Sequence, residues 1–407
     1  MEKAQIYNKG KIGEELVSNF FDSYFSKFFT FPDPKTKANA QVADVLVWFN
    51  WTVFLVEVKA RDKGPATIES WVKGKIKEAV QQIRNNYYRI KNNETINLHN
   101  AYYQTPLDCL NISDIVGLVI LVYDEECKIN PSSVLPDIYN LEFPVHVLSW
   151  KNLRDMIREI DTVSDFFYYL SDRYKYLKIS DIPLDEELNV LGYYKSKSNK
   201  FPDFAIDFSS SNYWHEYMTK LAGRILIRNV HNSFSGWIDA LEENFSDQRK
   251  LYLGYPLGLY FAWELSSISR RERAYFGEKF EMVQDWFKEG HSDRKFAFLN
   301  ISTGNWLLFY YSKSELAELD KELQRLVELK LCLEIETDSF EYAVYGFGFR
   351  VSKDNSPQLL GLSSAIFIGA DYMKGKYSKA DIEEARSHFG SKDQREERLI
   401  QEFPDLE

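Results

Sequence analysis

Two apolar runs joined by a short connection dominate residues 41–62, QVADVLVWFNWTVFLVEVKARD. Valine, phenylalanine and tryptophan favour strands, and the two residues between the runs, Asn50 and Trp51, suit the loop of a tight hairpin. In this register Asp44 on the first strand lies directly opposite Glu57 on the second. The stretch therefore predicts a buried hairpin that brings two carboxylates together.

Opposed carboxylates are an unfavourable pair in a hairpin that has only a structural role. Their Cβ atoms lie about 4.5–5.5 Å apart, and the repulsion is on the order of 3 kcal/mol at an effective dielectric of about 20. A different turn, protonation of one acid or a cation between the two would relieve this repulsion. Asp44 and Glu57 offer hard oxygen ligands, which Mg²⁺ or Mn²⁺ binds together with water and substrate phosphate.

Lys59 follows Glu57 by two residues and shares its face of the strand. An ammonium group there can orient or help deprotonate a metal-bound water, or stabilise negative charge on a phosphate. The alternative is that Glu57 and Lys59 form an ion pair on an edge strand while Asp44 points to solvent. That alternative leaves unexplained why the upstream acid stands among apolar residues.

The composition is that of a soluble globular chain, with 44% hydrophobic and 27% charged residues over 407 positions, a length that favours two domains. The net charge of −11 excludes nucleic-acid binding through a uniformly basic surface, so such binding needs a local patch. Three cysteines are too few for a disulfide framework. No apolar segment approaches the roughly 20 residues of a membrane span. We therefore expect a cytoplasmic protein with no membrane segment.

The order of apolar segments predicts an α/β first domain, in which a mixed sheet is flanked by helices. Helical periodicity covers residues 11–29 and 71–90, before and after the hairpin. The continuous apolar run 115–123 is typical of a strand covered on both faces. A further strand at 143–150 leads into a helix, and His146 within it is expected to be a core residue.

A polar, irregular segment divides the chain in two. Residues 176–205 carry prolines, serines and many charges, a composition typical of loops. We therefore predict a first domain over residues 1–175, a linker over 176–205 and a C-terminal α+β domain over 206–407. The second domain would recognise a target, a partner or a signal, and the apolar segment 251–263 within it is expected to be buried.

The first domain resembles the PD-(D/E)xK nuclease superfamily. Asp44 and the later triplet EVK at 57–59, at the end of an apolar strand, match the D…ExK form of the family pattern. KGKIGEEL is similar to the G-x-x-G-E opening of its restriction-endonuclease-like and nuclease-related branches, and EAVQQI is similar to their A-x-x-Q helix. The resemblance covers residues 9–90, extends loosely to about 165, and departs from the family at Ala43, where proline is usual. It implies a restriction-endonuclease-like fold.

The resemblance also implies a role for each matching residue. Asp44, Glu57 and the carbonyl of Val58 would hold Mg²⁺ or Mn²⁺, and Lys59 would assist the attacking water. The reaction would be hydrolysis of DNA that leaves a 5′-phosphate and a 3′-hydroxyl.

Helix geometry selects between neighbouring polar residues. At about 100° per residue, Glu14 lies beside the apolar face of the first helix whereas Glu15 points away, and Gln82 lies on the flank of the second helix whereas Gln81 faces solvent. By resemblance, Glu14 matches an acid that binds a metal or its water, and Gln82 matches a residue that orients a phosphate or the lysine. The alternatives are an acid favoured by the helix N-terminus and an ordinary polar flank residue.

A basic segment follows the proposed site. Between Lys59 and Lys91 nine lysines or arginines stand against three acids. Such a local surface fits phosphodiester binding, and the alternative is a solvated helix face. The expected nucleic-acid-binding residues are Lys73, Lys75, Lys77, Arg84 and Arg89.

These patterns predict a divalent-metal-dependent endonuclease acting on double-stranded DNA. The acidic charge of the whole chain suggests that access to the site needs an activating protein partner or a homo-oligomer with paired sites. At the level of the family, such two-part nucleases often serve restriction or antiphage defence. A catalytically silent nuclease-like module that binds nucleic acid or protein, and a ribonuclease, are the competing hypotheses.

Overall fold

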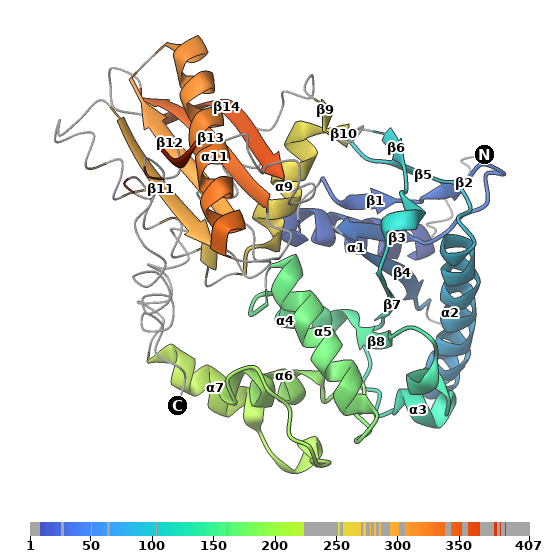
Figure 1. The fold of residues 1–407 in the computed structure, drawn as a ribbon. Coiled ribbons are helices and arrows are strands. Elements are labelled where there is room, and N and C mark those ends of the chain that lie inside the picture. Colours follow the sequence, from blue (N-terminus) through green and yellow to red (C-terminus); the bar gives the residue numbers. More distant parts are fainter. Residues whose placement is uncertain are drawn as a thin grey trace, which may run out of the picture. The chain divides into compact units, whose positions relative to one another are not determined.

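The chain forms two compact units (Figure 1). The computed structural model describes residues 9–25, 28–49, 51–62, 66–102, 104–160 and 162–223, and shorter segments between residues 251 and 387. All described residues up to 223 belong to the first unit, and those from 251 onward belong to the second.

A five-stranded sheet forms the centre of the first unit, and it is mixed, as the sequence predicted. Its strands, in spatial order, are β1 (Thr30–Pro32), β3 (Val45–Phe49), β4 (Thr52–Ala60), β7 (Asp114–Val122) and β8 (Val145–Ser149). The pairs β1–β3 and β3–β4 are antiparallel, whereas β4–β7 and β7–β8 are parallel. The carboxyl ends of β4, β7 and β8 therefore meet at one edge of the sheet, where ligands bind in many α/β proteins.

Helices α1 (Lys9–Phe25) and α2 (Ile68–Lys91) cover opposite faces of this sheet. A Cβ atom on Gly13 of α1 would lie 2.9 Å from the Cβ atom of Ala60, and one on Gly117 of β7 would lie 2.8 Å from Cγ2 of Ile83 in α2. Gly117 pairs with Leu55 and so shares its face, which is the face opposite that of Ala60 because side chains alternate along a strand. Glycine at these two positions allows each helix to approach the sheet closely.

The remaining elements of the first unit surround this α/β core. A small sheet contains β2 (Lys35–Thr36), β5 (Ile96–His99) and β6 (Gln104–Pro106). Short helices follow at η1 (Cys109–Asn111), α3 (Pro131–Val134) and η2 (Ile138–Asn140). After the sheet come α4 (Trp150–Ile157), α5 (Val163–Leu177), α6 (Glu187–Ser196), η3 (Phe208–Ser210) and α7 (Tyr213–Ala222).

A buried ion pair ties α6 to α5. Nη2 and Nε of Arg173 donate to the two carboxylate oxygens of Glu187 at 2.5 and 2.7 Å, and the hydroxyl of Tyr169 donates to Glu187 Oε1 at 2.7 Å. Nδ1 of His146 on β8 lies 3.0 Å from Nη1 of Arg173, and this histidine is fully buried as expected of a core residue. Arg173 thus joins two helices through an ion pair and contacts the sheet through His146.

The observed division of the chain differs in place from the predicted linker. Within residues 176–205, helix α6 contributes Val190 and Leu191 to the buried core, in addition to Glu187. The boundary between the two compact units falls after residue 224. The polar composition of this segment reflects a solvated outer face and a buried charge, both of which belong to the first unit.

The second unit contains a four-stranded sheet and helices, in agreement with an α+β arrangement. The strands, in spatial order, are β11 (Arg294–Asn300), β12 (Trp306–Ser312), β13 (Ala343–Val351) and β14 (Pro357–Ile366). The short strands β9 (Leu251–Tyr252) and β10 (Tyr255–Pro256) precede α9 (Leu257–Ser267), and α11 (Leu316–Thr337) connects the parallel strands β12 and β13.

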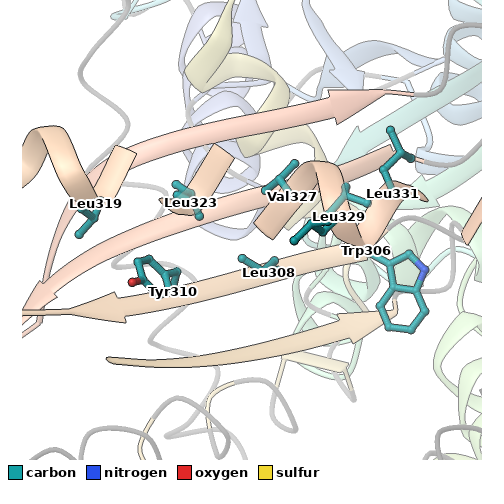
Figure 2. Packing of buried hydrophobic residues seen from close by; sticks show 9 residues of the cluster. Trp306, Leu308, Tyr310, Leu319, Leu323, Val327, Leu329 and Leu331 are labelled. Atoms are coloured by element: carbon teal, nitrogen blue, oxygen red, sulfur yellow. The ribbon is translucent and has the colours of Figure 1, made fainter. Parts of the chain in front are cut away.

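One face of this second sheet packs against α11 (Figure 2). Leu308 and Tyr310 of β12 lie against Leu319, Leu323 and Val327 of the helix, all of them buried. In the predicted buried segment, the described side chains from 261 to 263 are also buried. No helix in the described part of the chain is both long and apolar enough to cross a membrane.

Replacing Glu187 with glutamine tests the buried ion pair. The variant should lose about 3–5 kcal/mol of unfolding free energy, because it leaves the Arg173 guanidinium buried and without a counter-charge. The control is Lys175→Gln, which breaks the exposed pair between Lys175 and Asp172 and should cost roughly 0–1 kcal/mol. Urea unfolding followed by circular dichroism measures both. Equal losses in the two variants would contradict the importance of the pair.

Candidate active site

The hairpin of β3 and β4 has the predicted register up to its last regular pair. Phe49 pairs with Thr52, and the ladder continues to Val45 opposite Val56. The pattern then changes at Asp44, whose backbone N–H donates to the carbonyl of Val56 at 3.1 Å. Strand β3 therefore begins directly after the first acid.

The side chain of Asp44 continues the hydrogen bonding where the backbone ladder ends. Its Oδ2 atom accepts the backbone N–H of Val58 at 2.7 Å, and its Oδ1 atom accepts Nε2 of Gln41 at 3.2 Å. A carboxylate held at both oxygens has a fixed orientation. Asp44 is therefore part of the hairpin structure as well as a candidate ligand.

Lys59 brings the two acids together. Its Nζ atom lies 3.0 Å from Oε2 of Glu57 and 3.8 Å from Oδ2 of Asp44. The side chains of Lys59 and Asp44 are each only 10% exposed, and that of Glu57 is 5% exposed. The alternative in which Asp44 points to solvent is therefore wrong, and the ammonium group supplies part of the charge compensation that the opposed acids require.

Burial sets the protonation chemistry of this cluster. Burial and, after it, the charge of Asp44 raise the pKa of Glu57 to about 7, against the opposing charge of Lys59. Burial also raises the pKa of Asp44, although Lys59 and the N–H of Val58 lower it. For Lys59, burial lowers the pKa, but the charges of Glu57 and Asp44 outweigh that effect and raise it. The cluster therefore gains or loses a proton near neutral pH.

Glu14 approaches the cluster from the other face of the sheet. Its helix, α1, covers the face of Ala60, whereas Glu57 and Lys59 share the face covered by α2. The pKa of Glu14 is raised, first by burial and then by the charge of Asp44. The structure thus places Glu14 within electrostatic reach of the cluster, and Glu15 is exposed as predicted.

Gln82 lies on α2, on the flank that faces Lys59, but it does not contact the cluster. Its side chain is exposed and makes no hydrogen bond with any residue in the described part of the chain. Glu78, one turn earlier on the same flank, is a residue that the sequence reasoning missed. Its charge adds to the effects of Glu57 and Asp44 in raising the pKa of Lys59, and it pairs with Lys75 at 2.6 Å.

Gln41 is a second functional candidate that was missed. The side-chain amide of Gln41 also donates to the carbonyl of Ala43 at 3.2 Å. The backbone carbonyl of Gln41 accepts a hydrogen bond from Nη1 of Arg89 at 3.3 Å. Gln41 therefore links α2 to the carboxylate of Asp44. No periodicity identifies it, because it lies in a loop, and its position three residues before Asp44 is the only signal in the sequence.

The donor set fits a cation bound mainly by two carboxylates. Asp44, directly before β3, and Glu57 on β4 supply hard oxygens, and Mg²⁺ commonly takes one or two carboxylates together with water. In the described residues, no group of three or more His, Cys, Asp or Glu side chains is arranged to hold a metal ion. Glu14 therefore forms no three-carboxylate group with Asp44 and Glu57 in this arrangement, and a cation between the two acids would require the ammonium of Lys59 to move aside.

The expected nucleic-acid-binding residues fall on two different flanks of α2. Lys75 and Arg89 lie on the flank of the cluster and have acidic partners, Glu78 and Glu94. The other expected residues, Lys73, Lys77 and Arg84, are exposed on the opposite flank. The structure thus brings only part of the basic segment toward the candidate site.

Comparisons of the chain with protein-family models, curated proteins and solved structures give no match. The interpretation of the cluster therefore rests on its geometry and on the sequence resemblance.

The raised pKa of Glu57 predicts a pH-dependent stability in the absence of metal. The folded protein binds this proton more tightly than the unfolded chain, whose ordinary value is 4.5, so the stabilisation is present below about pH 4.5 and is lost as the pH rises through about 7. Relative to Glu57→Gln, the wild type should lose on the order of 3 kcal/mol between pH 4.5 and 8.

Urea unfolding in EDTA across this pH range measures the difference between the two proteins. Glu15→Gln, which removes an exposed acid of α1, is the control. A difference between wild type and Glu57→Gln that stays constant with pH would show that Glu57 ionises in the folded protein as it does in the unfolded chain.

Proposed function

We propose that the chain is a divalent-metal-dependent endonuclease that hydrolyses phosphodiester bonds of double-stranded DNA. The observation that supports this most strongly is the buried cluster of Asp44, Glu57 and Lys59 at the carboxyl edge of the parallel strands. A lysine within salt-bridge distance of two buried acids suits phosphate chemistry. The sequence resemblance to PD-(D/E)xK nucleases supports the same reaction.

Asp44 and Glu57 would hold Mg²⁺ or Mn²⁺, with the carbonyl of Val58 as a further oxygen donor. When bound, the ion supplies Lewis-acid polarisation of the phosphate and a more acidic water. Gln41 and the N–H of Val58 keep the Asp44 carboxylate oriented. Because both contacts are already formed in the folded chain, the Asp44 carboxylate would be oriented before a substrate arrives.

Lys59 would act on the substrate once its ammonium group is released from the carboxylates of Asp44 and Glu57. Its ammonium can donate a hydrogen bond to the attacking water or to a phosphate oxygen, and so position the water or stabilise developing charge. Glu14 would hold a water at the edge of the sheet, and Gln82, which is exposed, is free to contact a phosphate. The products would be a 5′-phosphate and a 3′-hydroxyl.

A catalytically silent binding module is the second candidate, and one observation favours it. Lys59 lies within salt-bridge distance of both Asp44 and Glu57 and so compensates part of their charge by itself. In such a protein the cluster would stabilise the hairpin, and the fold would serve only to bind nucleic acid or protein.

The second unit would then provide recognition of a target, an activating partner or another copy of the chain. DNA as substrate, as opposed to RNA, rests on the family resemblance, and so does a role in restriction or antiphage defence. A cytoplasmic location rests instead on the three scattered cysteines.

A cleavage assay separates the two candidates. Wild type, Asp44→Asn and Lys59→Met are incubated with plasmid, linear duplex, single-stranded DNA and RNA, each with Mg²⁺ or Mn²⁺. The proposal expects cleavage of duplex DNA by the wild type and a loss of about 100-fold or more in each variant. Lys151→Met, which changes an exposed lysine on α4, is the control and should cleave like the wild type.

Three outcomes would contradict the proposed enzyme. Equal cleavage by all four proteins would mean that the cluster does not carry the activity. Absence of cleavage on every substrate with both metals would favour the binding module, whereas cleavage of RNA alone would assign a ribonuclease.

A further inference from the structure

Helix α2 presents two different flanks, one on either side of its buried stripe. Ile76, Ile83 and Ile90 are buried and recur every seven residues, so they mark the stripe that faces the sheet. At about 100° per residue, Lys75 and Gln82 lie roughly 80–100° to one side of this stripe. The other side carries a row of cations, which we call the basic flank: Lys73, Lys77, Arg84 and Lys91.

The basic flank is a regular row. Its members are separated by four, seven and seven residues, spacings that keep side chains within about 40° of one another on a helix. At 1.5 Å per residue the row is about 27 Å long. All four side chains are exposed.

The two flanks differ in how their charges are compensated. On the flank of the cluster, Lys75 pairs with Glu78 at 2.6 Å and Arg89 with Glu94 at 3.7 Å. On the basic flank, Lys73, Lys77 and Arg84 have no ion pair with any residue that the structure describes. Lys91 lies 5.8 Å from the ring of Tyr87, a contact that leaves its charge in place.

Uncompensated like charges at helical spacing repel one another. The basic flank remains uncompensated although the chain has an excess of acids, with a net charge of −11. A linear polyanion would relieve the repulsion along the whole row. Duplex nucleic acid fits this requirement, because its phosphates recur along a rigid axis. An acidic protein segment would match the charge but has no comparably regular spacing.

We propose that the basic flank binds the phosphodiester backbone of double-stranded nucleic acid, independently of sequence and of metal. The choice of nucleic acid as the ligand rests on the proposed function, since the other flank of the same helix faces Lys59. The basic flank supplies affinity and the cluster supplies chemistry. Two groups of residues that the sequence placed in one patch thus have separate tasks.

Binding of a labelled duplex of about 20 base pairs to the full chain in EDTA tests this, because such a probe exceeds the length of the row at 3.4 Å per pair. The variant is the triple substitution Lys73→Gln, Lys77→Gln and Arg84→Gln. The matched control is Lys151→Gln, Lys200→Gln and Lys220→Gln, which removes the same charge from exposed positions. Affinity is measured over a range of NaCl concentrations with two unrelated sequences.

The inference expects the slope of log affinity against log salt to fall by about 1 for each cation removed, thus by about 3 in the triple variant. The weakening should be equal for both sequences, and the control should keep the slope of the wild type. With Mg²⁺, KM should rise in the triple variant while kcat is retained.

The inference is wrong if the triple variant and the control have the same slope and affinity, or if the wild type shows no salt-dependent binding. It is also wrong if polyglutamate displaces the duplex at equal charge concentration. Each is distinguishable from failure of the proposed function. Binding that depends on the basic flank without cleavage in any metal would reject the enzyme and retain the inference. Cleavage that the triple substitution leaves unchanged would do the reverse.

Discussion

The contact between the ammonium of Lys59 and the carboxylates of Asp44 and Glu57 is the interaction on which this account depends. Two acids within reach of one ammonium in a buried hairpin carry more negative charge than it can neutralise. The raised pKa of Glu57 expresses that excess, because burial and the charge of Asp44 together favour the neutral acid. A group of this kind can gain a proton or bind a cation, and both are useful for chemistry on a phosphate.

The rest of the first unit holds this cluster in place. Gly13 and Gly117 allow one helix on each face to approach the sheet closely, which brings Glu14 from one side and Glu78 from the other. Gln41 connects the loop before β3 to Arg89 of α2. The cluster is therefore bordered by two helices and a loop, all anchored on the central strands.

The sequence predicted the elements of the fold better than the contacts between them. The register of the hairpin followed from a two-residue loop, and the alternation of side chains placed Lys59 on the face of Glu57. Composition predicts a linker at residues 176–205 because they are polar on average, whereas the boundary between the two units falls after residue 224. What fixes α6 is the pairing of Glu187 with Arg173, a contact between distant residues that no local pattern reveals.

The same distinction applies to the site. Helical periodicity correctly separated Glu14 from Glu15 by exposure, since it depends only on position along one helix. It could not reveal Gln41 or Glu78, because their importance comes from the folded chain placing them beside Asp44 and Lys59. A count of charges predicts a single basic surface for a similar reason, since it does not distinguish the two flanks of a helix.

The most direct test of the central claim is the crystal structure of the protein with Mn²⁺, located by its anomalous scattering above pH 7. The account predicts one ion bound by carboxylate oxygens of both Asp44 and Glu57, with the ammonium of Lys59 moved away from at least one of them. A structure at saturating Mn²⁺ in which Lys59 still contacts both acids, and no ion lies beside them, would contradict it.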